Sequence, residues 1–186
     1  MDFNLPTNLT LLRIALIPVL VVTFYLPWEA SNVVCALIFL AAAFTDWLDG
    51  YLARRMDQAT KFGAFLDPVA DKLMVAVVLV LVVQAEPTGF LAIPAAVIIG
   101  REITIASLRE WMAELGLRKK IEVSWLGKFK TFAQMTAIVS LLYSDSLLGV
   151  PMRSVGYVFL YFSVFLTIWS MLIYLRDALP SMLEHR

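Results

Sequence analysis

The sequence has 186 residues, of which 61% are hydrophobic and 16% are charged, and its mean hydropathy is +0.81. Soluble domains carry charged residues at about a quarter of their positions, so this composition excludes an ordinary soluble protein and indicates one membrane domain over residues 1–186. The net charge of zero gives no support to nucleic-acid binding. With one cysteine, Cys35, and one histidine, His185, the sequence also excludes an internal disulfide, a Cys/His zinc site and a histidine-dependent triad.

Prolines and glycines separate the apolar stretches of the chain, which predicts a series of helices. The apolar stretches are residues 14–26, 33–44, 73–85, 90–99, 132–143 and 155–175. Only the last stretch has the roughly 20 residues that an unaided membrane span requires. We therefore expect each shorter stretch to be one half of a longer helix, the half toward the outside of the cell, whose other half is polar. A soluble all-helical bundle is the alternative, which the scarcity of polar residues around each stretch disfavours.

The distribution of basic residues predicts the orientation in the membrane. With the N-terminus in the cytoplasm, only Arg153 among the lysines and arginines falls in an outer loop, as the positive-inside rule requires of six spans with both termini inside. Before Arg13, Phe3, Leu5 and Leu9 stand among polar residues, which indicates a short amphipathic helix. The expected fold is all-α: an integral membrane bundle of six transmembrane helices with a short N-terminal interfacial helix.

Four aspartates form two pairs at helical spacing. Asp46 and Asp49 are three residues apart, and Asp67 and Asp71 are four apart, so each pair lies on one face of a helix. The polar residues 57–61 predict a turn that folds the two helices against each other. Four clustered carboxylates near a bilayer need compensating positive charge, and oxygen ligands favour Mg²⁺ or Mn²⁺, a pair of which could bridge a diphosphate.

Each aspartate also has a purely structural interpretation. Asp67 followed by Pro68 is typical of a helix start, with the aspartate as the cap and the proline as the first helical residue. An ion pair with Arg54 or Lys72 is the other structural role. For a single aspartate these roles are favoured, whereas the combination of four spaced acids, three small residues and an arginine favours a binding site.

The small residues Gly50, Ala53 and Gly63 let a nucleotide approach the backbone closely. The complete pattern is Asp46-x2-Asp49-Gly50-x2-Ala53-Arg54-x8-Gly63-x3-Asp67-x3-Asp71. This pattern resembles, position by position, the signature of the CDP-alcohol phosphatidyltransferase family of membrane enzymes. The similarity covers essentially the whole chain, and the segments 4–13, 101–111 and 127–131 resemble the branch of the family that uses glycerol 3-phosphate.

The resemblance implies an enzyme of anionic phospholipid (phosphatidylglycerol) biosynthesis. Such an enzyme transfers the phosphatidyl group of CDP-diacylglycerol to the 1-hydroxyl of sn-glycerol 3-phosphate, giving phosphatidylglycerophosphate and CMP. It also implies a homodimer in the bacterial cytoplasmic (inner) membrane, with the active site at the cytoplasmic leaflet among membrane phospholipids.

The family's site residues can be carried onto matching positions. The resemblance implies two divalent ions, Mg²⁺ or Mn²⁺, held by Asp46, Asp49, Asp67 and Asp71. It makes Asp71 the catalytic base as well, although the residues alone leave open whether Asp71 is a base or only a ligand. The positions that shape the CDP pocket are Gly50, Ala53, Arg54 and Gly63.

The phosphate of the acceptor requires a pocket of cations, for which arginine is preferred. The candidates on the fourth and fifth helices are Arg101, Arg109, Lys128 and Lys130. Arg101 and Arg109 are eight residues apart, which places them within about 80° on one helix. The alternative is that these four residues lie at the membrane interface or pair with Glu102 and Glu110.

Three other functions fit part of the pattern. A family member with inositol phosphate or serine as acceptor would keep all four aspartates and differ in the basic pocket. A membrane prenyltransferase also holds a diphosphate through aspartates and Mg²⁺, but without this framework of glycine, alanine and arginine. A transporter could use the acids to relay protons or ions without any enzymatic activity.

Overall fold

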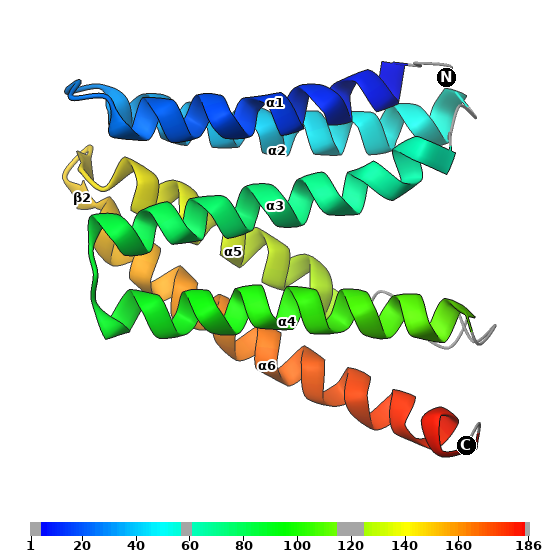
Figure 1. Cartoon of the computed structure of the whole chain (residues 1–186). Helices are drawn as coiled ribbons and strands as arrows, with labels where there is room; N and C mark the ends of the chain where they lie inside the picture. Colours follow the sequence, from blue (N-terminus) through cyan, green and yellow to red (C-terminus); the bar gives the residue numbers. More distant parts are fainter. Residues whose placement is uncertain (1–4, 57–60, 115–124, 185–186) are drawn as a thin grey trace.

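The computed structural model describes residues 5–56, 61–114 and 125–184, which form a bundle of long helices (Figure 1). The helices are α1 (Leu5–Tyr25), α2 (Ser31–Met56), α3 (Lys61–Ala85), α4 (Gly89–Glu114), α5 (Trp125–Tyr143) and α6 (Met152–Glu184). A short antiparallel hairpin of β1 (Ser146–Leu147) and β2 (Val150–Pro151) joins α5 to α6. The prediction of an all-α fold with six long helices is confirmed.

The elements are arranged so that both termini lie at the same end of the bundle (Figure 1). The start of α1, the end of α2, the start of α3 and the ends of α4 and α6 lie toward this end, which we call the terminal end. The α1–α2 connection, the α3–α4 connection and the hairpin lie at the opposite end (Figure 1). The C-terminal half of α2 and the N-terminal half of α3, which carry the aspartates, are therefore neighbours of the N-terminus.

The helices extend beyond their apolar stretches, as the sequence predicts. α2 continues past Phe44 to Met56, α3 begins well before Leu73, and α4 continues past Ile99. The polar halves of these three helices all lie toward the terminal end (Figure 1). A helix can continue through such a polar stretch inside a membrane protein because its backbone N–H and C=O groups hydrogen-bond within the helix.

Two predicted helix boundaries are wrong. Asp67 and Pro68 do not start a helix, because α3 begins at Lys61 and Pro68 lies inside it. A proline removes one backbone hydrogen bond and crowds the preceding turn, and α3 bends in its first turns instead of ending there (Figure 1). The separate interfacial helix is not found among the described residues, because α1 runs unbroken from Leu5 and no glycine or proline follows Pro6 before Pro18.

The core of the bundle is apolar and receives side chains from every helix. Among the most buried are Leu20, Phe39, Val78, Ile98, Ile138 and Leu160. The outer surface is also apolar: the exposed fractions of Val22, Ile93 and Phe165 are 61%, 67% and 61%. A soluble monomer does not expose apolar surface on this scale, so the surface is that of a membrane protein.

Among the residues that the structure describes, three helices are long and apolar enough to cross a membrane. They are Thr7–Tyr25, Gly89–Glu114 and Met152–Arg176, and the apolar part of α2, Ser31–Asp46, is shorter. The expectation that only residues 155–175 reach this length was wrong. The reason is that α1 begins before Ile14 with further apolar residues such as Leu9 and Leu12, and that α4 continues through Arg101 and Glu102 into further apolar residues such as Ile103.

An ion pair at the end opposite the termini connects α6 to the loop between α3 and α4. The guanidinium Nε of Arg153 donates to a carboxylate oxygen of Glu86 at 2.9 Å. This hydrogen bond lowers the pKa of Glu86 below its ordinary value. Arg153, the basic residue assigned to an outer loop, thus lies at the end away from the aspartates.

Candidate active site

An arginine on α1 joins the aspartates of α2 and α3. Arg13 is 1% exposed, and its Nη1 lies 3.0 Å from Oδ1 of Asp46 on α2. The same nitrogen donates to Oδ1 of Asp71 on α3. One turn earlier on α1, the hydroxyl of Thr10 donates to Oδ1 of Asp67 at 2.5 Å. Two residues of the first helix therefore supply the three contacts that gather the carboxylates of the other two helices.

The structure brings three of the four predicted aspartates to this place. Asp67 and Asp71 lie one turn apart on α3, and Asp71 and Asp46 share the guanidinium of Arg13. The side chain of Asp49 lies outside the described residues. Within the described part of the chain, no three acidic, histidine or cysteine residues stand close enough to hold a metal ion by themselves.

The chemistry of the gathered groups fits a divalent cation. The donors are carboxylate oxygens, which hard cations such as Mg²⁺ and Mn²⁺ prefer. The side chains of Asp46 and Asp71 are 44% and 41% exposed, so a solvated ion can reach them. The guanidinium of Arg13 already compensates part of the negative charge of these two carboxylates.

The predicted nucleotide-binding residues lie at the same end of the bundle. Gly63 is buried in the first turn of α3. Gly50, Ala53 and Arg54 belong to the last turns of α2, and their side chains lie outside the described residues. The backbone thus places all four on the two helices that carry the aspartates.

A second charged cluster lies between α4, α5 and α6. The carboxylate of Glu102 accepts hydrogen bonds from Nη1 of Arg101 at 3.0 Å and from Nζ of Lys130 on α5. Lys130 is only 4% exposed. Two candidates for phosphate binding are thus partners of Glu102, as the alternative interpretation proposed. The side chain of the fourth candidate, Lys128, lies outside the described residues.

Helix α6 contacts both candidate arginines. Nη2 of Arg101 donates to the hydroxyl of Ser170 at 3.2 Å, and Nε of Arg109 donates to the hydroxyl of Tyr174 at 2.9 Å. The sequence indicated neither Ser170 nor Tyr174, because both contacts join residues more than 60 positions apart. The Nε of Arg101 is buried and has no hydrogen-bond partner among the described residues.

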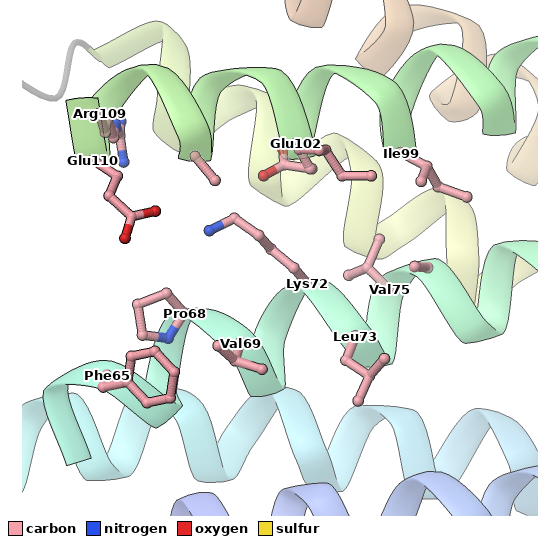
Figure 2. A pocket seen from close by; sticks show the side chains of 13 residues that line it. Phe65, Pro68, Val69, Lys72, Leu73, Val75, Ile99, Glu102, Arg109 and Glu110 are labelled. Carbon is pink, nitrogen blue, oxygen red and sulfur yellow. The ribbon is translucent and has the colours of Figure 1, made fainter. Parts of the chain in front are cut away.

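A cavity of about 610 Å³ lies between α3 and α4. Figure 2 shows Lys72 reaching from α3 across this cavity toward Glu102, with Arg109 and Glu110 further along α4. The other walls are mostly apolar, from residues such as Phe65. A space with apolar walls and a few charged groups suits an amphiphilic ligand.

The sequence as a whole matches a known family. Residues 3–169 match the CDP-alcohol phosphatidyltransferase family, and the chain belongs to that family. The predicted resemblance is therefore confirmed.

Several bacterial proteins are similar to this chain over nearly its full length. The chain is 53% identical to the CDP-diacylglycerol–glycerol-3-phosphate 3-phosphatidyltransferase of Pectobacterium atrosepticum over 99% of this chain and 100% of that protein. It is also 53% identical to the protein of the same name from Haemophilus influenzae, over 100% of this chain and 98% of the relative. With the relative from Sodalis glossinidius the identity is 52% over the full length of both.

Proposed function

We propose that this protein transfers the phosphatidyl group of CDP-diacylglycerol to the 1-hydroxyl of sn-glycerol 3-phosphate, giving phosphatidylglycerophosphate and CMP. The observation that carries the proposal is the identity of 52–53% to bacterial enzymes named for this reaction, over almost the full length of each chain. The gathering of Asp46, Asp67 and Asp71 around Thr10 and Arg13 supports it, because the reaction needs a site for a diphosphate.

The metal site in this proposal consists of four aspartates. Two ions, Mg²⁺ or Mn²⁺, would be held by Asp46, Asp49, Asp67 and Asp71. Members of the family use divalent metal ions, and the bound ions neutralise charge on the diphosphate of the donor. Gly50, Ala53, Arg54 and Gly63 would shape the pocket for the CDP group, since they lie on the same two helices.

The reaction requires a base near the acceptor hydroxyl, and we assign this role to Asp71. The hydroxyl oxygen forms a bond to the phosphorus that carries the diacylglycerol, and the bond from that phosphorus to the CMP oxygen breaks. The hydroxyl proton passes to the carboxylate of Asp71, and CMP leaves. Arg13 holds this carboxylate in a fixed orientation, which favours proton transfer because the acceptor of a proton must lie within hydrogen-bond reach.

The acceptor phosphate would bind the basic cluster. The residues assigned to it are Arg101, Arg109, Lys128 and Lys130. Support comes from the position of Arg109 on the wall of the cavity, whereas Arg101 and Lys130 reach the same region through their ion pairs with Glu102, another wall residue. The cluster carries more positive than negative charge, as binding of a phosphate dianion requires.

The setting of the enzyme follows from the same proposal. The chain would form one domain over residues 1–186, with six transmembrane helices and both termini in the cytoplasm, in the inner membrane of a bacterium. Both termini lie at the end of the bundle that carries the aspartates, which supports an active site at the cytoplasmic leaflet (Figure 1). The active form would be a homodimer.

The test is an assay of CMP release by the purified protein in mixed micelles of detergent and CDP-diacylglycerol. Release should require Mg²⁺ or Mn²⁺ and glycerol 3-phosphate, and a chelator should abolish it. Inositol phosphate and serine serve as control acceptors. Release with one of these acceptors instead would refute the proposed substrate, and no release with any acceptor would refute the enzymatic function.

A further inference from the structure

Tyr174 on α6 makes two distinct contacts with the guanidinium of Arg109. Its hydroxyl accepts a hydrogen bond from Nε at 2.9 Å, and its ring centroid lies 5.4 Å from the central guanidinium carbon. The second distance is that of a cation–π interaction, in which the cation is more often arginine than lysine. The two contacts together fix both the position and the plane of the guanidinium.

These contacts leave the terminal nitrogens of Arg109 available for a ligand. A guanidinium has five N–H groups, and the hydrogen bond to Tyr174 uses the one on Nε. In the part of the chain that the structure describes, no other residue hydrogen-bonds Arg109, so Nη1 and Nη2 remain for an anion. Two parallel N–H groups are the geometry that binds a phosphate in bidentate fashion.

Arg101 is held differently. Its Nη1 donates to Glu102 and its Nη2 donates to Ser170, so both terminal nitrogens have protein partners. The hydroxyl of Ser170 in turn donates to the carbonyl of Thr167 at 3.0 Å, which fixes its lone pairs toward Arg101. Of the two arginines, Arg109 is therefore the one whose two terminal nitrogens can both bind a ligand.

Tyr174 is itself held by packing between α4 and α6. Its half-buried side chain packs, together with Met171 and Leu175 of the same helix, against a small apolar cluster of α4 formed by Ile105, Leu108 and Met112. Because the ring packs against this cluster, its motion is restricted compared with that of the exposed Arg109 side chain. A fixed aromatic ring can therefore orient a flexible arginine side chain at the wall of the cavity that Arg109 lines.

From these contacts we infer that Tyr174 is a positioning residue for recognition of the acceptor. It holds Arg109 by Nε and by the ring face, so that Nη1 and Nη2 bind the phosphate of glycerol 3-phosphate as a pair. This inference rests on the proposed function, because it assumes a phosphate-bearing acceptor. According to this inference, helix α6 influences the affinity for the acceptor through Arg109, without touching the acceptor itself.

The test compares Tyr174→Phe, which keeps the ring and removes the hydroxyl, with the unmodified protein. We expect the KM for glycerol 3-phosphate to rise about tenfold, equivalent to about 1.4 kcal/mol, with kcat and the KM for CDP-diacylglycerol unchanged within about twofold. The inhibition constant of inorganic phosphate should rise by the same factor. In an Arg109→Lys background, which lacks the Nε hydrogen bond, Tyr174→Phe should have no further effect.

The matched control is Tyr161→Phe, also on α6, whose hydroxyl donates to the carbonyl of Phe90 at 3.1 Å. This variant should keep the KM and the phosphate inhibition constant of the unmodified protein. An unchanged KM in Tyr174→Phe, or an equal effect with and without Arg109→Lys, would overturn the role of Tyr174. An unmodified protein that releases no CMP with glycerol 3-phosphate would instead overturn the proposed function.

Discussion

Replacement of Arg13 by methionine removes the cation shared by two carboxylates. The net contribution of a hydrogen bond to a charged group is about 1.5–3 kcal/mol of folding stability. Asp46 and Asp71 are more than two-fifths exposed, so the lower figure applies to each bond, and the two bonds together contribute about 3 kcal/mol. For a chain of this size, that loss corresponds to a decrease in Tm of about 6–12 °C.

The single cysteine of the chain, Cys35, provides the assay. It is buried at 1% exposure, so a thiol-reactive fluorescent dye reports its exposure when the protein unfolds in detergent. Arg153→Met is the matched control: Arg153 also pairs with a carboxylate, but its side chain is 51% exposed, so the loss should stay below about 1 kcal/mol. Mn²⁺ should restore more of the Tm of Arg13→Met than it adds to the unmodified protein, because it replaces the missing positive charge. Equal decreases in Tm for the two arginine variants would refute this reasoning.

Two further predictions concern the base and the packing of α5 against α6. Asp71→Asn should lower CMP release at least about 100-fold, because the substitution removes the proton acceptor. The control is Asp145→Asn, which changes an exposed aspartate at the opposite end of the bundle and should keep full activity. Normal turnover by Asp71→Asn would exclude Asp71 as the base. Gly156→Ala should lower the free energy of unfolding by about 1–3 kcal/mol, because its Cβ would lie 2.6 Å from Cγ of Leu141. Gly100→Ala, with no atom within 4 Å of its Cβ, should be at least as stable as the unmodified protein in the same dye assay, and an equal decrease for both would contradict the packing argument.

The sequence predicted the helices well because hydropathy and helix breakers are local properties. Pro27, Pro87 and Gly149 each fall in a connection between helices. The polar inner halves of the helices were also predictable, since a helix does not end where its side chains become polar. The start of α3 was mispredicted because Asp67 and Pro68 carry the local features of a helix start, whereas the helix begins at Lys61 and the carboxylate of Asp67 accepts a hydrogen bond from Thr10 on α1.

The site was predictable only where its residues repeat at helical spacing. Asp67 and Asp71 share a face through their separation of four residues, which the sequence shows directly. Arg13 has no such relation to its partners, so it stood out only as one basic residue among fifteen. Tyr174 likewise contacts Arg109 across 65 positions, and such a contact follows from how α4 and α6 pack, not from spacing.

The buried ion pairs of α1 have a consequence for how the chain is made. No acidic residue occurs in Leu5–Tyr25, and Asp71 follows Arg13 by 58 residues. While the ribosome is still producing α2, the guanidinium of Arg13 must therefore stay hydrated, since an unpaired arginine at membrane depth costs about 2.5–3.5 kcal/mol. The first helix is thus expected to reach its final depth in two steps, first when Asp46 on α2 pairs with Arg13 and then when α3 brings Asp71, so that the active site closes during synthesis and not at first insertion.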